Sequence, residues 1–213
     1  MEQADLVGAL MLSLGVKKYH VLAHDYGDTV LQELLARALE RDDEGHTGGA
    51  IQSAVMLNGG IVPSAHRVLL AQTALAAMPA AAALVPDAIA TGAIRKTFAV
   101  QQADEEIDAM LAVIAHKGGR AVSGLQLAYI AERKTHEGRW VGALRSTATP
   151  LRFVCGLADP ISGSHMADAF EAEMVDGADI VRLEGVGHWP SIEAPEAVAD
   201  AVRRFHRQLL KGR

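Results

Sequence analysis

The chain has 213 residues, of which 50% are hydrophobic and 22% are charged, and its formal net charge is −6. This length can bury a sizeable core and favours one domain over two. The acidic balance and the lack of a long Lys/Arg block argue against nucleic acid as a partner. The single cysteine, Cys155, excludes an internal disulfide framework and favours a reducing, cytoplasmic location.

The first apolar run, Leu6–Val16, is shorter than the roughly 18 residues that a membrane span needs. It follows the acidic Glu2 and Asp5, so it lacks the basic start of a signal peptide. Its hydrophobic residues recur at helical spacing, and Gly15 supplies a stop. We therefore predict no membrane span and a buried helix that leads into the first strand.

The next elements alternate between strand and helix. Tyr19–Leu22 is a short apolar strand, and the periodicity from about Thr29 to Arg41 predicts a helix. Ala50–Leu57 is a second strand, and it ends at a cluster of chain-breaking residues, Asn58-Gly59-Gly60.

From Pro63 to about Ser146 the chain is rich in Ala and shows no convincing strand. Glu105–His116 and Leu125–Lys134 have helical periodicity. Because this helical block interrupts the strand pattern, we interpret it as a cap inserted into a sheet domain.

The alternation of strands and helices resumes after the cap. Leu151–Cys155 and Asp179–Leu183 are strand candidates, Met166–Met174 has a helical pattern, and the last helix begins at Pro195. Strands that alternate with helices predict an α/β fold, a parallel sheet with helices on both sides.

The sequence Ala23-His24-Asp25-Tyr26-Gly27 joins the first strand to the helix that follows it. A nucleophile flanked at two residues on either side by small residues is typical of the nucleophile elbow, a turn so tight that larger flanking side chains do not fit. Here the central residue is Asp25, not Ser. A carboxylate attacks an sp³ carbon and leaves an alkyl ester on the enzyme, which water must then hydrolyse.

Two further polar residues follow later strands. Asp159 comes after Leu151–Cys155, and His188 comes after Asp179–Leu183. The carboxyl ends of parallel strands lie at one edge of a sheet, so both side chains are expected to meet Asp25. His188 would then remove a proton from water, and Asp159 would orient its imidazole. The backbone N–H of Tyr26 would stabilise the oxyanion.

These features resemble the α/β-hydrolase superfamily, in the region of epoxide hydrolases and haloalkane dehalogenases. The resemblance covers most of the chain and rests on four blocks: Leu22–Asp28, Leu57–Ile61, Arg139–Leu144 and Asp159-Pro160.

The resemblance implies a hydrolase core over residues 1–63 and 147–213 and a helical cap over residues 64–146. It implies nucleophile, acid and base at Asp25, Asp159 and His188, a small-molecule substrate and no cofactor. Epoxide opening is the first expectation and carbon–halogen cleavage the second. Tyr26 stands where both groups of enzymes commonly carry Trp, whose indole N–H is a good donor to a halide, so its replacement by Tyr weakens the expectation of carbon–halogen cleavage.

The chain departs from the family pattern at its start. Hydrolases of this type place several strands and a His-Gly loop before the elbow, whereas here one helix precedes it. We therefore expect the N-terminal part of the sheet to be missing, which leaves an exposed sheet edge. A non-catalytic module that binds a ligand or partner is thus an alternative function. An ester or carbon–carbon hydrolase is a weaker one, since it normally has Ser at position 25.

Three other residues are candidates for contact with substrate: Tyr129, Asn58 and Trp189. Tyr129 would hydrogen-bond the epoxide oxygen or pack in the core, Asn58 would face the pocket or cap a turn, and Trp189 would contact substrate or pack. No metal site is expected, because five histidines lack metal-ligand spacing with Cys or acidic partners: His20, His46, His66, His116 and His136. The oligomeric state stays open, with a homo-oligomer among the alternatives.

Overall fold

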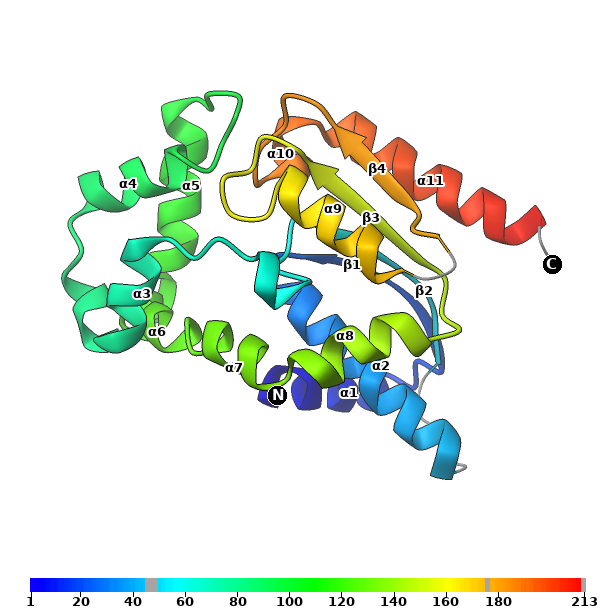
Figure 1. Cartoon of the computed structure of the whole chain (residues 1–213). Coiled ribbons are helices and arrows are strands. Elements are labelled where there is room, and N and C mark those ends of the chain that lie inside the picture. Colours follow the sequence, from blue (N-terminus) through cyan, green and yellow to red (C-terminus); the bar gives the residue numbers. More distant parts are fainter. Residues whose placement is uncertain (45–49, 175–176, 212–213) are drawn as a thin grey trace.

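The computed structural model describes residues 1–44, 50–174 and 177–211 (Figure 1). Its centre is a four-stranded sheet in the order β1-β2-β3-β4, and all neighbouring strands are parallel. The strands are β1 (Lys18–His24), β2 (Ala50–Leu57), β3 (Leu151–Gly156) and β4 (Ile180–Leu183). The predicted α/β fold class and all four predicted strands are therefore confirmed.

Both faces of the sheet are covered by helices (Figure 1). Ala54 and Met56 of β2 belong to a core cluster that residues of α2, α8 and α9 complete. Val55 and Leu57, the residues between and beyond them, belong to a second cluster with residues of α11. Side chains alternate between the faces of a strand, so the uninterrupted apolar run of β2 reflects burial on both sides. The helices are α1 (Glu2–Ser13), α2 (Tyr26–Glu44), α8 (Glu137–Ser146), α9 (Ser164–Glu173), α10 (Pro190–Glu193) and α11 (Pro195–Lys211).

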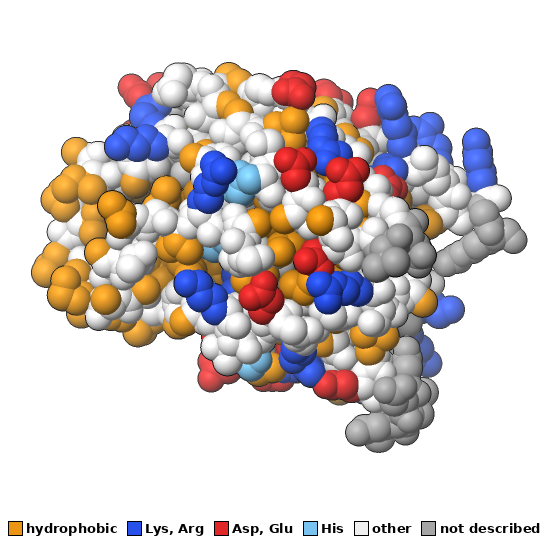
Figure 2. Space-filling model, in the orientation of Figure 1, with side chains coloured by type: hydrophobic (Ala, Val, Ile, Leu, Met, Phe, Trp, Pro, Cys, Tyr) orange, Lys and Arg blue, Asp and Glu red, His pale blue; other side chains and the backbone are white. Residues whose placement is uncertain are grey.

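The segment between β2 and β3 contains helices and no strand, as its composition predicts. The expected helix Leu125–Lys134 is in fact two helices, because α6 ends at Gln126 and α7 begins at Tyr129. Figure 2 shows many hydrophobic side chains on the outer surface of this helical segment. Its elements are η1 (Pro63–Ala65), α3 (Leu70–Ala77), η2 (Pro79–Leu84), α4 (Asp87–Arg95), α5 (Asp104–Ala115), η3 (His116–Gly118), α6 (Gly119–Gln126), α7 (Tyr129–Thr135) and α8 (Glu137–Ser146).

The helix α1 is not buried, and the prediction of a buried helix before β1 is wrong. Ala4 is the one residue of α1 that is buried, while Leu6 is 63% exposed and Leu12 is 82% exposed. The apolar spacing correctly predicts a helix, but periodicity alone does not say whether a second surface covers the apolar face. Ala4 and Val7 pack against the core, and the remainder of the apolar face stays in solvent.

A buried carboxylate joins α2 to α8. Glu33 accepts hydrogen bonds from Trp140 Nε1 at 2.7 Å, Arg139 Nε at 2.9 Å and Arg37 Nε at 2.7 Å. Burial disfavours the charged form of Glu33, but these donors outweigh it and lower its pKa to about 2. The block Arg139–Leu144 therefore anchors the helical segment to the helix that carries the elbow.

Candidate active site

The loops that follow the four strands meet at one edge of the sheet. His24, the last residue of β1, is in register with Leu57, the last residue of β2. Leu57 is in register with Val154 of β3, and the ends of β3 and β4 pair through Gly156 and Leu183. Residues that directly follow these strands are thereby brought together although they lie far apart in the sequence.

Asp25 occupies a tight turn between β1 and α2. Its φ is +48°, a backbone conformation that costs energy for a non-glycine residue and is held here by its surroundings. Asp25 N donates to Leu57 O at 3.1 Å, and Asp28 N donates to Asp25 O at 3.2 Å. A Cβ atom placed on Gly27 would lie 3.6 Å from Ala23 Cβ, which is already van der Waals contact. These small flanking residues let the turn close and leave the Asp25 side chain 34% exposed.

The structure brings Asp25, His188 and Asp159 together. His188 Nδ1 donates to Asp159 Oδ2 at 2.8 Å, and His188 Nε2 lies 3.8 Å from Asp25 Oδ2. The first contact is a hydrogen bond, and the second is longer than one. The imidazole thus lies between two carboxylates, with one ring nitrogen turned toward each.

Asp159 is held by several donors besides His188. Asn58 Nδ2 donates to its Oδ2 at 3.0 Å, Ser162 Oγ donates to the same atom at 2.7 Å, and Ile161 N donates to Oδ1 at 2.7 Å. Asn58 also accepts a hydrogen bond from Gly156 N at 2.8 Å. Asn58 is fully buried and links the end of β2 to the loop after β3, so its amide positions Asp159.

The charges of the three groups are coupled. Burial disfavours the imidazolium of His188, yet the carboxylates of Asp159 and Asp25 together raise its pKa well above the ordinary value of 6.5. Burial likewise acts to raise the pKa of Asp25, but His188 and the cation of Arg133 lower it overall. His188 is therefore protonated at neutral pH, and Asp25 is a carboxylate.

Backbone and ring contacts hold the loop that carries His188. His24 Nε2 donates to His188 O at 2.7 Å, and His188 N donates to Thr97 O at 2.9 Å. Trp189 donates its indole N–H to Thr97 Oγ1 at 2.8 Å, and its ring stacks on Phe98 with a centroid distance of 6.0 Å. The indole N–H of Trp189 is thus already paired, so contact with a substrate would have to come through its ring.

A buried arginine lies on the other side of Asp25. Arg133, on α7, donates from Nη2 to Asp25 O at 3.2 Å and from Nε to Thr29 Oγ1 at 2.7 Å. Its Nη2 is 3.8 Å from Asp25 Oδ1. The guanidinium also stacks over the buried ring of Tyr129, 4.5 Å from the centroid, and this ring lies 4.6 Å from that of Tyr26.

Beside these two tyrosines is an open groove of about 480 Å³. Tyr26 and Tyr129 line it together with residues of α1, α6 and α7. Tyr26 is also the first residue of α2, and the first N–H groups of a helix have no acceptor within the helix. The backbone N–H of Tyr26 therefore has no acceptor within α2, and it lies next to Asp25 in the turn.

Comparisons with known proteins agree with the fold. A family model described as "Alpha/beta hydrolase family" matches residues 2–201. The chain belongs to the α/β-hydrolase family. Among curated proteins it is similar to LipZ of Mycobacterium tuberculosis, with 33% identity over 94% of this chain and 69% of LipZ. It is also similar to the mesoderm-specific transcript protein of Mus musculus, with 32% identity over 96% of this chain and 63% of that protein.

Solved structures show the same fold at low sequence identity. A haloalkane dehalogenase from Bradyrhizobium elkani superposes with a TM-score of 0.78 and 17% identity, over 100% of this chain and 75% of that one. An epoxide hydrolase superposes with a TM-score of 0.68 and 18% identity, over 97% of this chain and 74% of that one. The chain thus spans about two thirds to three quarters of the length of the relatives and structures it matches.

Three residues of this α/β-hydrolase site were not singled out by the sequence analysis. His24 is a variable position of the elbow, and His66 enters the sequence analysis only as a histidine without metal-ligand spacing. Arg133 lies within Glu132-Arg133-Lys134, a charge run of the kind that usually faces solvent. The spacing of Arg133 is the sequence feature that points to it, because Arg133 follows Tyr129 by four residues and so shares its helix face.

Within the described residues, His, Cys, Asp and Glu side chains form no group that could hold a metal ion. Over the same residues, no helix has both the length and the apolar character that crossing a bilayer requires.

Proposed function

We propose that this chain is a hydrolase that uses the Asp25 carboxylate to open an epoxide, through an alkyl ester on the enzyme. The observation that carries the proposal is the placement of Asp25 on the elbow, 3.8 Å from His188, which is itself hydrogen-bonded to Asp159. The helical segment over residues 64–146 would act as the cap over a small, largely apolar substrate.

In the first step, an oxygen of Asp25 attacks an epoxide carbon and the carbon–oxygen bond of the ring breaks. The released oxygen keeps the electron pair and needs a proton. His188, which is protonated at rest, supplies it from Nε2. A halide would leave without needing this proton, so the charge state of His188 favours an epoxide over a haloalkane.

In the second step, His188 is neutral and Asp25 is an uncharged ester. One of the two carboxylates that raise the pKa of His188 is then absent, so the imidazole takes a proton from water at the moment when a base is required. The hydroxide adds to Asp25 Cγ, and the backbone N–H of Tyr26 stabilises the oxyanion. The tetrahedral intermediate then collapses, and the alkyl oxygen leaves as the second hydroxyl of the diol with a proton from His188. Asp25 is released as the carboxylic acid and returns its proton to His188.

The proposal is tested by trapping the ester. His188→Gln should accumulate an adduct whose mass increase equals that of the added styrene oxide, because ring opening, which must then take its proton from water, is slowed while hydrolysis of the ester stops. The matched control, His188→Gln with Asp25→Asn, should show no adduct on intact-protein mass spectrometry. Styrene oxide and 1-bromohexane, tried in parallel, separate epoxide opening from carbon–halogen cleavage. An adduct that survives the Asp25→Asn change would contradict the proposal.

One observation favours the alternative of a non-catalytic module that binds a ligand or partner. The separation of 3.8 Å between His188 Nε2 and Asp25 Oδ2 exceeds a hydrogen bond. A chain that melts cooperatively but forms no adduct with epoxides, haloalkanes or esters would support this alternative.

A further inference from the structure

Two buried nitrogen atoms next to the site lack a hydrogen-bond partner. These are Arg133 Nη1 and His66 Nε2, and neither finds an acceptor or donor within the described part of the chain. The side chain of Arg133 is only 1% exposed. A buried polar group without a partner costs free energy, so the fold must gain something from keeping these two.

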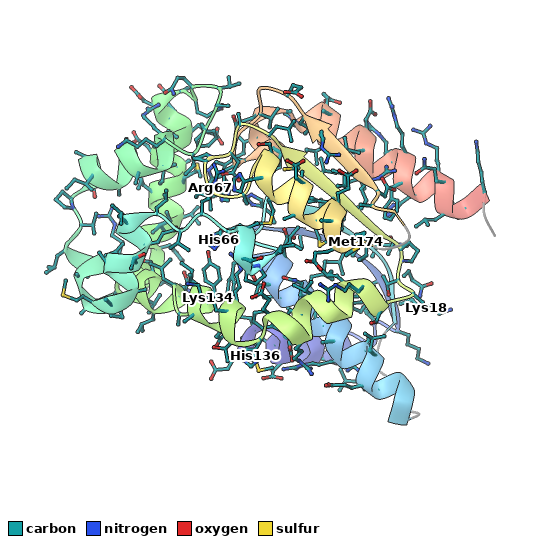
Figure 3. The ribbon with its side chains drawn as sticks, in the orientation of Figure 1. Lys18, His66, Arg67, Lys134, His136 and Met174 are labelled. Atoms are coloured by element: carbon teal, nitrogen blue, oxygen red, sulfur yellow. The ribbon has the colours of Figure 1, made fainter. Side chains whose placement is uncertain are left out.

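Both nitrogens lie near the same residue. A Cβ atom placed on Gly60 would lie 2.2 Å from Arg133 Nη1 and 3.1 Å from His66 Cδ2, the ring atom beside Nε2. Glycine at position 60 thus leaves room for the guanidinium of Arg133, which a Cβ atom there would displace. Figure 3 shows His66 at the boundary between the sheet and the helical segment. Both unpaired nitrogens come from the helical segment but from stretches far apart in the sequence, one from α7 and one from the residues after η1.

The charge of Arg133 becomes unbalanced as the proposed reaction proceeds. Asp25 is the carboxylate near it at rest, and ester formation removes that charge. Asp28 is a second buried carboxyl near Arg133, and burial raises its pKa well above 3.8, so its charged form is disfavoured. The carboxylate of Asp159 faces His188, and within the described residues no salt bridge joins it to Arg133. A buried cation without a counter-charge is costly, so the site is left in need of an anion.

The electrostatic state of His66 fits the same need. Burial, with help from the charge of Arg133, lowers its pKa to about 4, so the imidazole is neutral at pH 7. A neutral imidazole can present an N–H at Nε2 without adding a second charge. Arg133 and His66 together can therefore offer two donors to one negatively charged oxygen.

Building on the proposed function, we propose that Arg133 Nη1 and His66 Nε2 bind a negatively charged oxygen of the substrate beside Asp25. The oxygen is either a carboxylate that the substrate brings or the oxygen of an opening epoxide, an alkoxide that carries negative charge until His188 protonates it. This assigns the site to small electrophiles that carry or generate an oxygen anion next to the attacked carbon.

The two sources are separated in the His188→Gln background by the rate of Asp25 alkylation with three probes. Bromoacetate carries a carboxylate, bromoacetamide is its neutral analogue, and styrene oxide forms an alkoxide. Arg133→Gln should slow one class by about 10- to 100-fold, the range expected for one hydrogen bond to a charged group. Selective loss with bromoacetate identifies a carboxylate, and selective loss with styrene oxide identifies the alkoxide. Equal losses with all three probes, or none, would overturn the inference.

Two variants guard against misfolding and unspecific charge effects. Gly60→Ala keeps the charge of Arg133 but places a methyl group where Nη1 lies, so it should reproduce the selective loss. Arg145→Gln removes a half-exposed guanidinium that pairs with Glu173 on the surface and should change none of the three rates.

A binding measurement keeps the inference testable if no probe alkylates Asp25, which would itself contradict the proposed function. Acetate is titrated into the unchanged chain at constant ionic strength, and the guanidinium ¹⁵N signal of Arg133 is followed by NMR. Saturable binding that weakens at least about tenfold in Gly60→Ala supports an anion subsite. No saturable shift in the unchanged chain overturns it.

Discussion

The two halves of the site differ in how completely their polar groups are paired. On one side, Asp159 accepts hydrogen bonds from His188, Asn58, Ser162 and Ile161, and its side chain is fully buried. On the other side, Asp25 is one-third exposed, and Arg133 keeps a nitrogen without a partner. A group that only orients another can be fully paired, whereas groups that meet a substrate must keep free hydrogen-bonding capacity. We refer to these as the paired half and the open half.

The largest expected effect comes from Asp159→Asn in the paired half. An amide at this position would present an N–H to His188 Nδ1 and favour the wrong tautomer, so ester hydrolysis should slow by roughly 10⁴-fold. Formation of the ester on Asp25 should change far less. Single-turnover kinetics with styrene oxide measure both steps. Asp168→Asn, which changes an exposed surface ion pair, is the control, and a loss of hydrolysis below about tenfold would show that Asp159 does not orient the base.

The next effect concerns Glu33, the buried carboxylate that joins α2 to α8. Glu33→Ala leaves the buried indole N–H of Trp140 without an acceptor and removes the partner of Arg139, so it should lower the free energy of unfolding by about 3 kcal/mol. Glu40 bonds the same Arg139 but is 58% exposed, so Glu40→Ala should cost less than about 1 kcal/mol. Urea unfolding of the two variants measures the difference, and equal losses would mean that burial of Glu33 contributes nothing.

A smaller effect is expected from Asn58→Ala. Gly156 N and Asp159 Oδ2 would each lose a buried partner, which should cost roughly 2 kcal/mol. The φ of Asn58 is +36°, so Asn58→Gly should cost about 1 kcal/mol less than Asn58→Ala, because glycine adopts this conformation without strain. Thermal unfolding of the pair separates the backbone contribution from that of the hydrogen bonds. If both variants are as stable as the unchanged chain, Asn58 does not hold the paired half together.

Asp25, Asp159 and His188 are more accessible to sequence reasoning than the residues around Arg133. Asp25, Asp159 and His188 each follow a short apolar run, and parallel strands put such positions at one edge of the sheet. Their convergence follows from topology, and the structure brings them together. Asn58 was noticed as a residue after a strand, but its amide contacts depend on the loop after β3, whose path no local pattern specifies.

Arg133 and His66 could not be found in the same way. Both lie in the helical segment, where the sequence predicts helices but not the angles at which they pack. The burial of Arg133 depends on α7 lying against α2, which tertiary contacts decide. The misjudged burial of α1 has the same origin, since a repeating apolar spacing defines a helix face but not its partner.

The smallest expected effect is a change in the pKa of His188 when Asp25, in the open half, loses its charge. In the unchanged chain the carboxylates raise the pKa of His188 to about 10. Its contribution to stability is therefore complete below the unfolded value near 6.5 and is lost as the pH rises toward 10. Asp25→Asn mimics the uncharged ester, so the pKa of His188 should fall toward 6.5 while Asp159 keeps it above that value. The loss of stability should then be complete at a lower pH. NMR of the imidazole and urea unfolding between pH 6 and 10 measure both, with Asp200→Asn on the exposed face of α11 as a charge-matched control. A His188 that titrates near 6.5 in the unchanged chain would mean that it carries no proton for the epoxide oxygen, and the preference for epoxides over haloalkanes would lose its basis.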